Sequence, residues 1–235
     1  MNLRLDKYIT ENGLASRSDA GRSIRFGEVR VNGQPVRDPS FHIDPETDRV
    51  SYKGEEIIYR RFTYIMMNKP EGVLSATEDS RQTTVLDLLD KRLKRIGLFP
   101  CGRLDKDTVG LLILTNDGQL SHKLLSPRHH VPKTYRFETE KPLSRLDELE
   151  AGVTLEDGLV TKPCTVTPEG ERRGTITITE GKFHQIKRMF EAVDNRITFL
   201  ERIDFAGIPL DPNLPRGSWR YLTPEEESLI TGENE

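Results

Sequence analysis

The sequence is poor in cysteine, in long apolar runs and in metal-ligand patterns. Cys101 and Cys164 are the two cysteines among 235 residues, which excludes the disulfide framework of a small secreted domain. The five histidines have no ligand spacing with cysteine or acidic residues, so we predict no metal site. No run approaches the length that spans a membrane, and no charged segment followed by an apolar stretch opens the chain. These absences predict a soluble cytoplasmic protein without a membrane partner.

An excess of positive charge is also missing. The chain has 35 lysine and arginine residues against 38 aspartate and glutamate residues, with a net charge of -3 and a pI near 6.0. Such a balance supplies no long-range attraction to nucleic acid. The charge is uneven, because the first 30 residues are net positive and the residues after Arg220 are acidic. A polyanion must therefore be bound by local basic patches, with an affinity that falls as salt is added.

The first 36 residues predict two short helices and a hairpin. Apolar residues recur at helical spacing from Leu5, and Gly13 can adopt the positive φ that ends a helix. A second helix begins at Ser16, which has capping-box spacing with the acidic residue three positions on, and it stops at Gly27. The dipeptide Asn32-Gly33 lies between two alternating segments and predicts a tight hairpin turn.

The second of these helices has two different faces. At about 100° per residue, Arg22 and Arg25 lie opposite Ala20 and Ile24, so one face is cationic and the other packs. The stretch RLDKYI, followed by GLASRSDAGRSIRFGEVRVNG, resembles the S4 RNA-binding domain over nearly its whole length. The resemblance implies an RNA-binding unit. The basic residues that we expect to contact RNA there are Arg4, Lys7, Arg17, Arg22, Arg25 and Arg30.

A second motif places a charged cluster, Asp105-Lys106-Asp107-Thr108, directly before the apolar run Leu111–Leu114. A rigid strand can aim a carboxylate from such a loop at a substrate. The cluster also fits D-x-D-x-[TV], the signature of phosphatases of the haloacid dehalogenase type, but that site needs the apolar strand before the first aspartate, and here the strand follows. A solvated turn at the head of a hairpin strand is the remaining structural alternative.

The whole run from Gly102 to Gly118 resembles the GRLDxxTxGLLxLTxDG motif of the pseudouridine synthases. These enzymes convert a uridine in RNA into its C-glycoside isomer, and the resemblance implies that Asp105 is the essential aspartate. Lys69-Pro70-Glu71-Gly72 is similar to the first motif of that family. In the family this motif ends a strand and packs beneath the site, so we interpret it as structural.

Two downstream segments resemble further motifs of the same family. Lys133-Thr134-Tyr135 matches a K-x-Y motif whose tyrosine stacks on the target uracil, which implies this role for Tyr135. The segment Glu180–Phe190 matches a motif in which a glycine turn leads to a helix with a basic residue that pairs with the aspartate. Alignment on Gly181 and His184-Gln185 assigns that basic position to Lys187.

A carboxylate, an aromatic ring and a cation also make physical sense together. Uracil in an RNA helix hides its C5 and C6 atoms, so the nucleotide must be flipped out at a cost of about a few kcal/mol. A stacked tyrosine offsets part of this cost. Burial disfavours an ionised carboxylate and a nearby cation counteracts that effect, although a lysine pairs less rigidly than an arginine. The further RNA contacts that we expect around this cleft are Arg103, Lys133, Lys182, His184, Gln185 and Arg188.

The order of predicted elements favours an α+β fold. Expected strands include residues 64–67, 111–114, 135–138, 175–179 and 198–203, and expected helices include residues 85–92, 119–125, 143–149 and 185–193. They do not alternate in βαβ units, which predicts a mostly antiparallel sheet. The resemblance implies a small S4 domain of two helices and short strands over residues 1–60. A catalytic domain with one long mixed sheet follows over residues 61–235, after a linker near Tyr59–Phe62.

Within the family, two segments favour one branch. HQIKRMF at residues 184–190 and the segment at residues 152–158 resemble the synthases of small-subunit (16S) ribosomal RNA, with uridine 516 as the implied target. Related large-subunit enzymes commonly carry RQVRRM instead. The resemblance implies a cofactor-free isomerase that acts as a monomer on 16S RNA, free or in an assembling subunit. A large-subunit target and a non-catalytic S4-bearing assembly protein are the alternatives.

Overall fold

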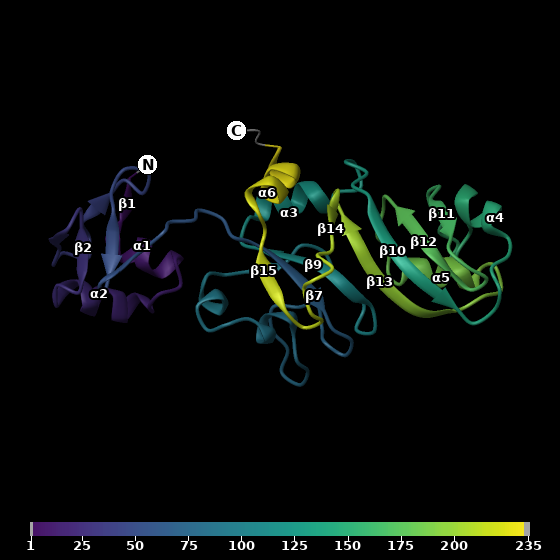
Figure 1. The fold of residues 1–235 in the computed structure, drawn as a ribbon, viewed down its shortest axis with the longest axis horizontal. Coiled ribbons are helices and arrows are strands. Elements are labelled where there is room, and N and C mark those ends of the chain that lie inside the picture. Colours follow the sequence, from purple (N-terminus) through teal and green to yellow (C-terminus); the bar gives the residue numbers. More distant parts are fainter. Residues whose placement is uncertain (1, 233–235) are drawn as a thin grey trace. The chain divides into compact units, whose positions relative to one another are not determined.

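The computed structural model describes residues 2–232, which form two compact units (Figure 1). The first unit contains the chain up to Thr63 together with Leu89–Leu98, and the second contains Tyr64–Leu88 and the chain from Phe99 onward. The sequence does not predict that residues 89–98 belong with the front of the chain. Among the described residues, no helix is both long enough and apolar enough to cross a membrane.

The first unit combines two helices with small antiparallel sheets around one apolar core. Its helices are α1 (Leu5–Glu11) and α2 (Arg17–Arg25). A four-stranded sheet has the order β3-β2-β5-β6, and β1 pairs with β4. The strands are β1 (Leu3–Arg4), β2 (Val29–Val31), β3 (Gln34–Pro35), β4 (His42–Ile43), β5 (Val50–Tyr52) and β6 (Glu55–Glu56). The inserted segment contributes the short 3-10 helix η2 (Leu93–Arg95).

The local signals in this unit produce the predicted elements. The hydroxyl of Ser16 accepts a hydrogen bond from the Asp19 amide at the start of α2, as expected of an N-cap. Ala20 and Ile24 on α2 are fully buried, whereas the arginines of this helix are exposed. The turn at Asn32 has a φ of 50° and joins β2 to β3. The predicted two-faced helix and hairpin are therefore confirmed.

The second unit is built on one long mixed sheet, which confirms the predicted fold class (Figure 1). The main path is β11-β12-β10-β13-β9-β7-β15, and every pairing along it is antiparallel except the parallel contact between β13 and β9. The strands are β7 (Tyr64–Lys69), β8 (Phe99–Pro100), β9 (Val109–Thr115), β10 (Lys133–Thr139), β11 (Thr165–Pro168), β12 (Arg173–Ile178), β13 (Ile197–Phe205), β14 (Ile208–Pro209) and β15 (Trp219–Tyr221).

The helices of the second unit are short. They are α3 (Gly118–Leu125), α4 (Leu146–Ala151), α5 (Gln185–Glu191) and α6 (Pro224–Thr231), with the 3-10 helix η1 (Val85–Leu88). The expected helices over residues 119–125 and 185–193 are close to α3 and α5. The expected helix over residues 85–92 is wrong, because the carboxylates of Asp87 and Asp90 accept bonds from the amides of Thr84 and Leu93 and so break it into separate turns. The expected helix over residues 143–149 starts later, because Arg145 has a φ of 54°.

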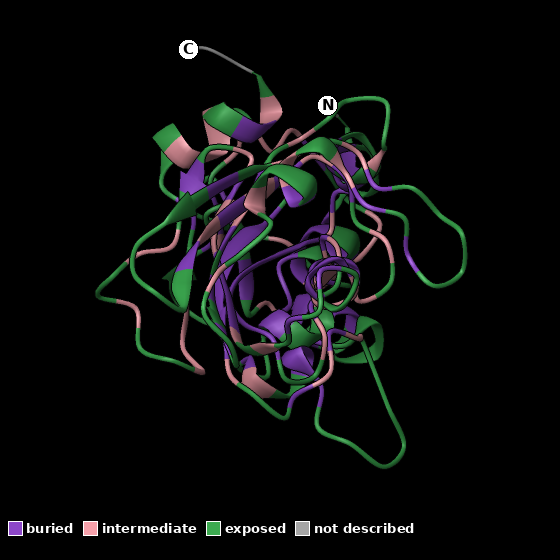
Figure 2. Ribbon diagram, turned by 90° about the vertical axis from the view of Figure 1, so that its right-hand side faces the viewer, coloured by how far each residue is buried: buried purple, intermediate pink, exposed green. Residues whose placement is uncertain are grey.

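The centre of the sheet is buried on both faces (Figure 2). Every residue of β7 and β9 is buried. Gly110 on β9 has a φ of 96°, and a Cβ atom there would lie 2.4 Å from the carbonyl oxygen of Arg202 on β13. The parallel contact of β9 with β13 involves this residue directly. Glycine is therefore required where the two halves of the sheet meet, at the start of the strand that follows the charged cluster at Asp105.

This requirement predicts the effect of Gly110→Ala. The methyl group would combine a strained φ with a clash against backbone, and we expect the free energy of unfolding to fall by about 3 kcal/mol or more. Gly207→Ala is the matched control, since Gly207 has a φ of 81° but open space around its Cα, and it should cost only about 1 kcal/mol. Urea denaturation followed by tryptophan fluorescence measures both. Equal losses would contradict the proposed close approach of β9 and β13.

Candidate active site

A buried lysine holds the loop that carries the charged cluster. Lys69, the last residue of β7, is fully buried. Its Nζ donates to the carbonyl oxygens of Pro70, Asp105, Lys106 and Thr108 at 3.1, 3.0, 3.2 and 2.9 Å. Burial lowers the pKa of Lys69 to about 8, so the ammonium form still prevails at neutral pH. Charge-assisted bonds to four carbonyls fix the path of the loop, which agrees with the structural interpretation of this motif.

The structure brings the side chains of Asp105 and Lys187 together. Lys187 Nζ, on α5, lies 3.1 Å from Asp105 Oδ2 and donates to Asp107 Oδ1 at 2.6 Å. His184 Nε2 is 3.6 Å from Asp105 Oδ1. The expected pair is therefore present, but the sequence does not predict that Lys187 is shared between two carboxylates. The D-x-D spacing is the signal that could have indicated it.

The contact between Lys187 and Asp107 stabilises the charged forms of both groups. Burial alone would lower the pKa of Lys187, but its bonds to Asp107 and Asp105 and their charges outweigh burial and raise that pKa above its usual value. Burial would likewise raise the pKa of Asp107, but the bond from Lys187 and its charge hold that pKa below its usual value. Lys187 is thus positively charged throughout the physiological pH range.

Tyr135 lines the same cavity as Asp105 and Lys187. It lies on β10, where alternate residues from Lys133 to Thr139 are buried, and it is itself 7% exposed. The cavity has a volume of about 80 Å³. Thr108 also lines it, and the buried Thr108 Oγ1 has no hydrogen-bond partner within residues 2–232. The cavity is thus lined by an aromatic ring, a carboxylate and an ammonium group.

A wider cleft of about 790 Å³ adjoins this cavity and shares Arg103, Asp105 and Tyr135 with it. This volume lies within the range of small-molecule binding sites. Phe183 lines the cleft, is 75% exposed and stacks on the ring of His184 with centroids 3.8 Å apart. An exposed aromatic ring at such a rim is a surface on which a base can stack. Phe183 is not among the residues expected from the sequence, although its place in the segment Glu180–Phe190 was a usable signal.

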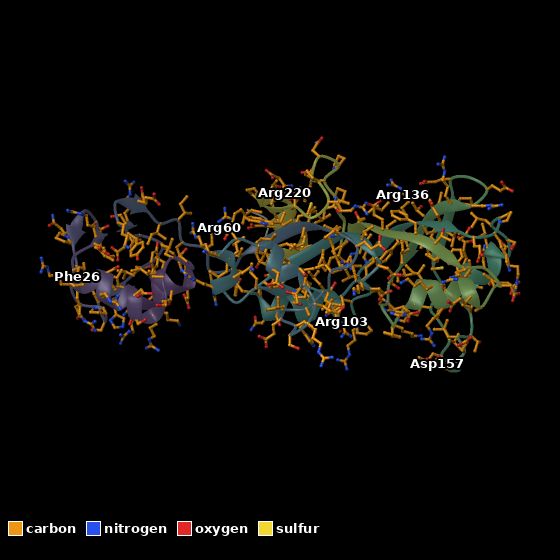
Figure 3. All side chains as sticks on the ribbon, turned by 90° about the horizontal axis from the view of Figure 1, so that it is seen from below. Phe26, Arg60, Arg103, Arg136, Asp157 and Arg220 are labelled. Atoms are coloured by element: carbon orange, nitrogen blue, oxygen red, sulfur yellow. The ribbon has the colours of Figure 1, made fainter. Side chains whose placement is uncertain are left out.

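The expected RNA contacts of this unit differ in their accessibility. Arg103, Lys182 and His184 line both cavities, and Arg103 projects on the side of the unit opposite to Arg136 (Figure 3). Lys133 lines the wider cleft but is buried. Arg188 is bonded to Asp157 at 2.5 Å.

Gln185 does not face the surface, contrary to expectation. It is 4% exposed, its Nε2 donates to Glu180 Oε1 at 2.6 Å, and its Oε1 accepts from the Lys182 amide at 2.9 Å. These bonds close the turn before α5. The polar atoms of Gln185 are thus engaged inside the protein, although the residue lines the smaller cavity, and its contact with RNA stays a prediction.

The basic residues of the first unit lie on its surface. Arg4 forms a bidentate pair with Asp6, Lys7 lies 3.4 Å from Glu11, and Arg22 lies 3.7 Å from Asp19. The pairs of Lys7 and Arg22 are exposed and therefore weak, so these two cations remain available to a polyanion, whereas Asp6, the partner of Arg4, is buried. The exposed basic side chains are those of Arg4, Lys7, Arg17, Arg22, Arg25 and Arg30.

Comparison with known proteins matches both units. Residues 63–192 match the family model of RNA pseudouridylate synthases, and residues 3–50 match the S4 domain. The chain is 48% identical over 234 residues to the RNA pseudouridine synthase YtzG of Bacillus subtilis (97% of this chain, 98% of the relative). It is 41% identical over 232 residues to ribosomal small subunit pseudouridine synthase A of Escherichia coli (97% and 100%). A solved structure described as a pseudouridylate synthase has 36% identity and a TM-score of 0.68, covering 97% of this chain and 100% of that one.

The bonds of Lys69 predict a large effect of Lys69→Met. A methionine leaves four carbonyl oxygens without their donor, and we expect the free energy of unfolding to fall by about 3 kcal/mol or more. Lys106→Met is the matched control from the same loop, because Lys106 is exposed and should change stability by at most about 0.5 kcal/mol. Hydrogen exchange of the amides at residues 103–108 should accelerate in Lys69→Met alone. Unchanged exchange in that variant would contradict the anchoring role.

Proposed function

This chain belongs to the RNA pseudouridine synthase family, as an isomerase with an S4 RNA-binding domain, and from this premise we propose that it isomerises uridine 516 of 16S ribosomal RNA. The HQIKRMF sequence of α5 and the full-length similarity to a relative named for the small ribosomal subunit support this choice. We further propose that the protein acts as a monomer in the cytoplasm, without a cofactor. A large-subunit target is the alternative that the experiment below separates.

Asp105 is the proposed catalytic residue, and its contact with Lys187 beside Tyr135 is the observation that carries the assignment. The reaction breaks the bond between N1 and C1′ of the uridine and forms a bond between C5 and C1′, after which C5 loses its proton and N1 takes one up. An ionised carboxylate can attack either the sugar or the base. Lys187 places a positive charge 3.1 Å from this carboxylate in a partly buried site, and no step in this scheme calls for a metal.

Tyr135 is the proposed platform for the flipped base. Its buried ring faces the cavity that contains Asp105, so a uracil that enters can stack on it. Stacking offsets part of the energy lost when the nucleotide leaves the RNA helix. The phenol is also the proposed group for proton transfer at C5, since it lines the same cavity as the carboxylate.

The decisive experiment maps pseudouridine in ribosomal RNA from cells with and without the gene. Chemical modification followed by reverse transcription reads every position of both subunits. We expect one pseudouridine to disappear from 16S RNA at position 516 and to return on complementation. Loss of a pseudouridine from large-subunit RNA instead would favour the alternative target, and no loss at any position would favour a non-catalytic assembly role.

Substitution of the two aspartates separates catalysis from charge. Asp105→Asn should abolish turnover with little change in RNA affinity, because the amide keeps the shape of the side chain but cannot attack. Asp107→Asn is the matched control, and it should leave measurable activity because Lys187 still lies beside Asp105. Single-turnover assays with saturating enzyme measure both. Turnover by purified Asp105→Asn would refute the assignment. A requirement for magnesium in the chemical step would instead favour the hypothesis of a phosphatase-like site.

The first unit is proposed to bind RNA without taking part in chemistry. Changing Arg22 and Arg25 to alanine together should weaken RNA binding and reduce the magnitude of the salt slope by roughly one per lost phosphate contact. The turnover rate of bound RNA should not change. Filter binding at several salt concentrations, together with single-turnover assays, tests both statements. Equal affinity of the wild type and the double variant at every salt concentration would exclude this helix face as an RNA contact.

A further inference from the structure

Two buried cations lie side by side on the floor of the wider cleft. Arg202 on β13 is 1% exposed, and its Nε donates to the carbonyl oxygen of Leu111 at 2.7 Å. Lys133 begins β10, is 8% exposed, and donates to the carbonyl oxygen of Val131 at 3.1 Å. The guanidinium of Arg202 and the ammonium of Lys133 lie 4.9 and 5.6 Å from the ring centroid of Phe205. Both residues line the cleft that contains Asp105.

Neither cation has a counter-ion in the part of the chain that the structure describes. Within residues 2–232, no carboxylate forms an ion pair with Lys133 or Arg202, and the buried Nη2 of Arg202 has no hydrogen-bond partner. Burial, and then the charge of Arg202, lower the pKa of Lys133 to about 8. Two like charges buried together without compensation destabilise a protein. Lys187, which lines the smaller cavity, is by contrast compensated by two carboxylates.

A structural role in the sheet explains only part of this arrangement. The bond from Arg202 Nε to Leu111 ties β13 to β9, next to the close approach at Gly110. It does not explain why Nη2 is left without a partner, or why a lysine lies beside an arginine. A methionine at position 133 would fill the same space without the electrostatic cost. The pair is therefore matched to an anion that enters the cleft.

The position of the pair indicates which anion. Lys133 and Tyr135 are two residues apart on β10, so their side chains leave the same face of the strand, about 7 Å apart. Tyr135 and Asp105 line the cavity for the flipped base. A phosphate held between Lys133 and Arg202 would thus lie about one nucleotide from that base. Tetrahedral phosphate oxygens accept bonds from both the planar guanidinium and the ammonium group.

We propose that Lys133 and Arg202 form a phosphate subsite that binds a backbone phosphodiester beside the target uridine. This inference rests on the proposed function, because it names the part of the RNA that the cleft receives. On binding, the phosphate neutralises the two buried cations and so removes the repulsion that destabilises the empty site. The subsite thus favours RNA whose target nucleotide is already flipped, since only then does the neighbouring phosphate reach the floor of the cleft.

The first test uses the protein without RNA. Thermal unfolding is compared in sodium phosphate and in sodium chloride at equal ionic strength, for the wild type, Lys133→Met and the control Lys123→Met, which changes an exposed lysine on α3. We expect phosphate to raise the Tm of the wild type and of the control but not of Lys133→Met. In chloride, Lys133→Met should be at least as stable as the wild type, because it removes an uncompensated charge.

Two outcomes of this test would overturn the proposal. One is equal stabilisation of Lys133→Met and the wild type by phosphate, which would place anion binding elsewhere. The other is a lower Tm of Lys133→Met in chloride, which would show that Lys133 is a structural residue without need of an anion. Lys133→Met is preferred to a change at Arg202, because Arg202 also ties β13 to β9.

The second test locates the phosphate in the RNA. A set of 16S fragments is prepared, each with a neutral methylphosphonate at a single linkage near the target uridine. The affinity of the enzyme for each fragment is measured under single-turnover conditions. At one linkage next to the uridine, the wild type should lose roughly tenfold to hundredfold in affinity, the equivalent of one charge-assisted hydrogen bond. Lys133→Met should be insensitive at that linkage only. Equal sensitivity of both proteins at every linkage would refute the subsite.

The two tests also separate this inference from the proposed function. If no pseudouridine depends on the gene but phosphate still stabilises the protein through Lys133, the anion site is real and the 16S target is wrong. If the modification at 16S RNA depends on the gene but phosphate does not stabilise the protein, the function holds and the subsite fails.

Discussion

The ammonium group of Lys69 is the constraint on which the candidate site depends. It is buried at the end of β7 and donates hydrogen bonds to four carbonyl oxygens, three of them in the loop that carries Asp105. A loop has few backbone partners of its own, so its geometry must be imposed from outside. Here the sheet imposes it through one charge. The carboxylate of Asp105 therefore has a defined position before any substrate arrives, which is what preorganised catalysis requires.

The cations around the cleft differ in whether a carboxylate is paired with them. Lys187 is paired with Asp105 and Asp107, so its charge is compensated when this part of the site is empty. Lys133 and Arg202 are uncompensated, so that part of the site is least stable when empty. A site with two carboxylates around one ammonium group, and with two uncompensated cations beside it, favours a ligand with a neutral ring and an adjacent anion. A nucleotide within RNA has this distribution of charge.

The sequence predicted those parts of the site that short motifs encode. The approach of Lys187 to Asp105 followed from matching two motifs that lie far apart in the sequence, and the mixed sheet followed from the order of elements. It did not predict the burial of Gln185 or the sharing of Lys187 with Asp107, because both depend on how α5 docks against the loop. No pattern in the sequence indicated that Arg202 belongs to the site. A lone arginine in a strand is normally a surface residue, and only the parallel contact of β13 with β9 brings it to the cleft.

The acidic composition of the chain is consistent with this arrangement. With a net charge of -3, the protein gains no general attraction to RNA, so non-specific binding is weak. Affinity must come from cations placed where an RNA phosphate or base can reach them: the exposed arginines of α2, Arg103 at the mouth of the cleft, and the buried pair on its floor. The buried pair contributes only to RNA that has already entered the cleft. Acidic residues elsewhere weaken the binding of all RNA, but RNA that enters the cleft regains affinity from the buried pair. The acidic composition thus raises the selectivity for RNA that can enter the cleft.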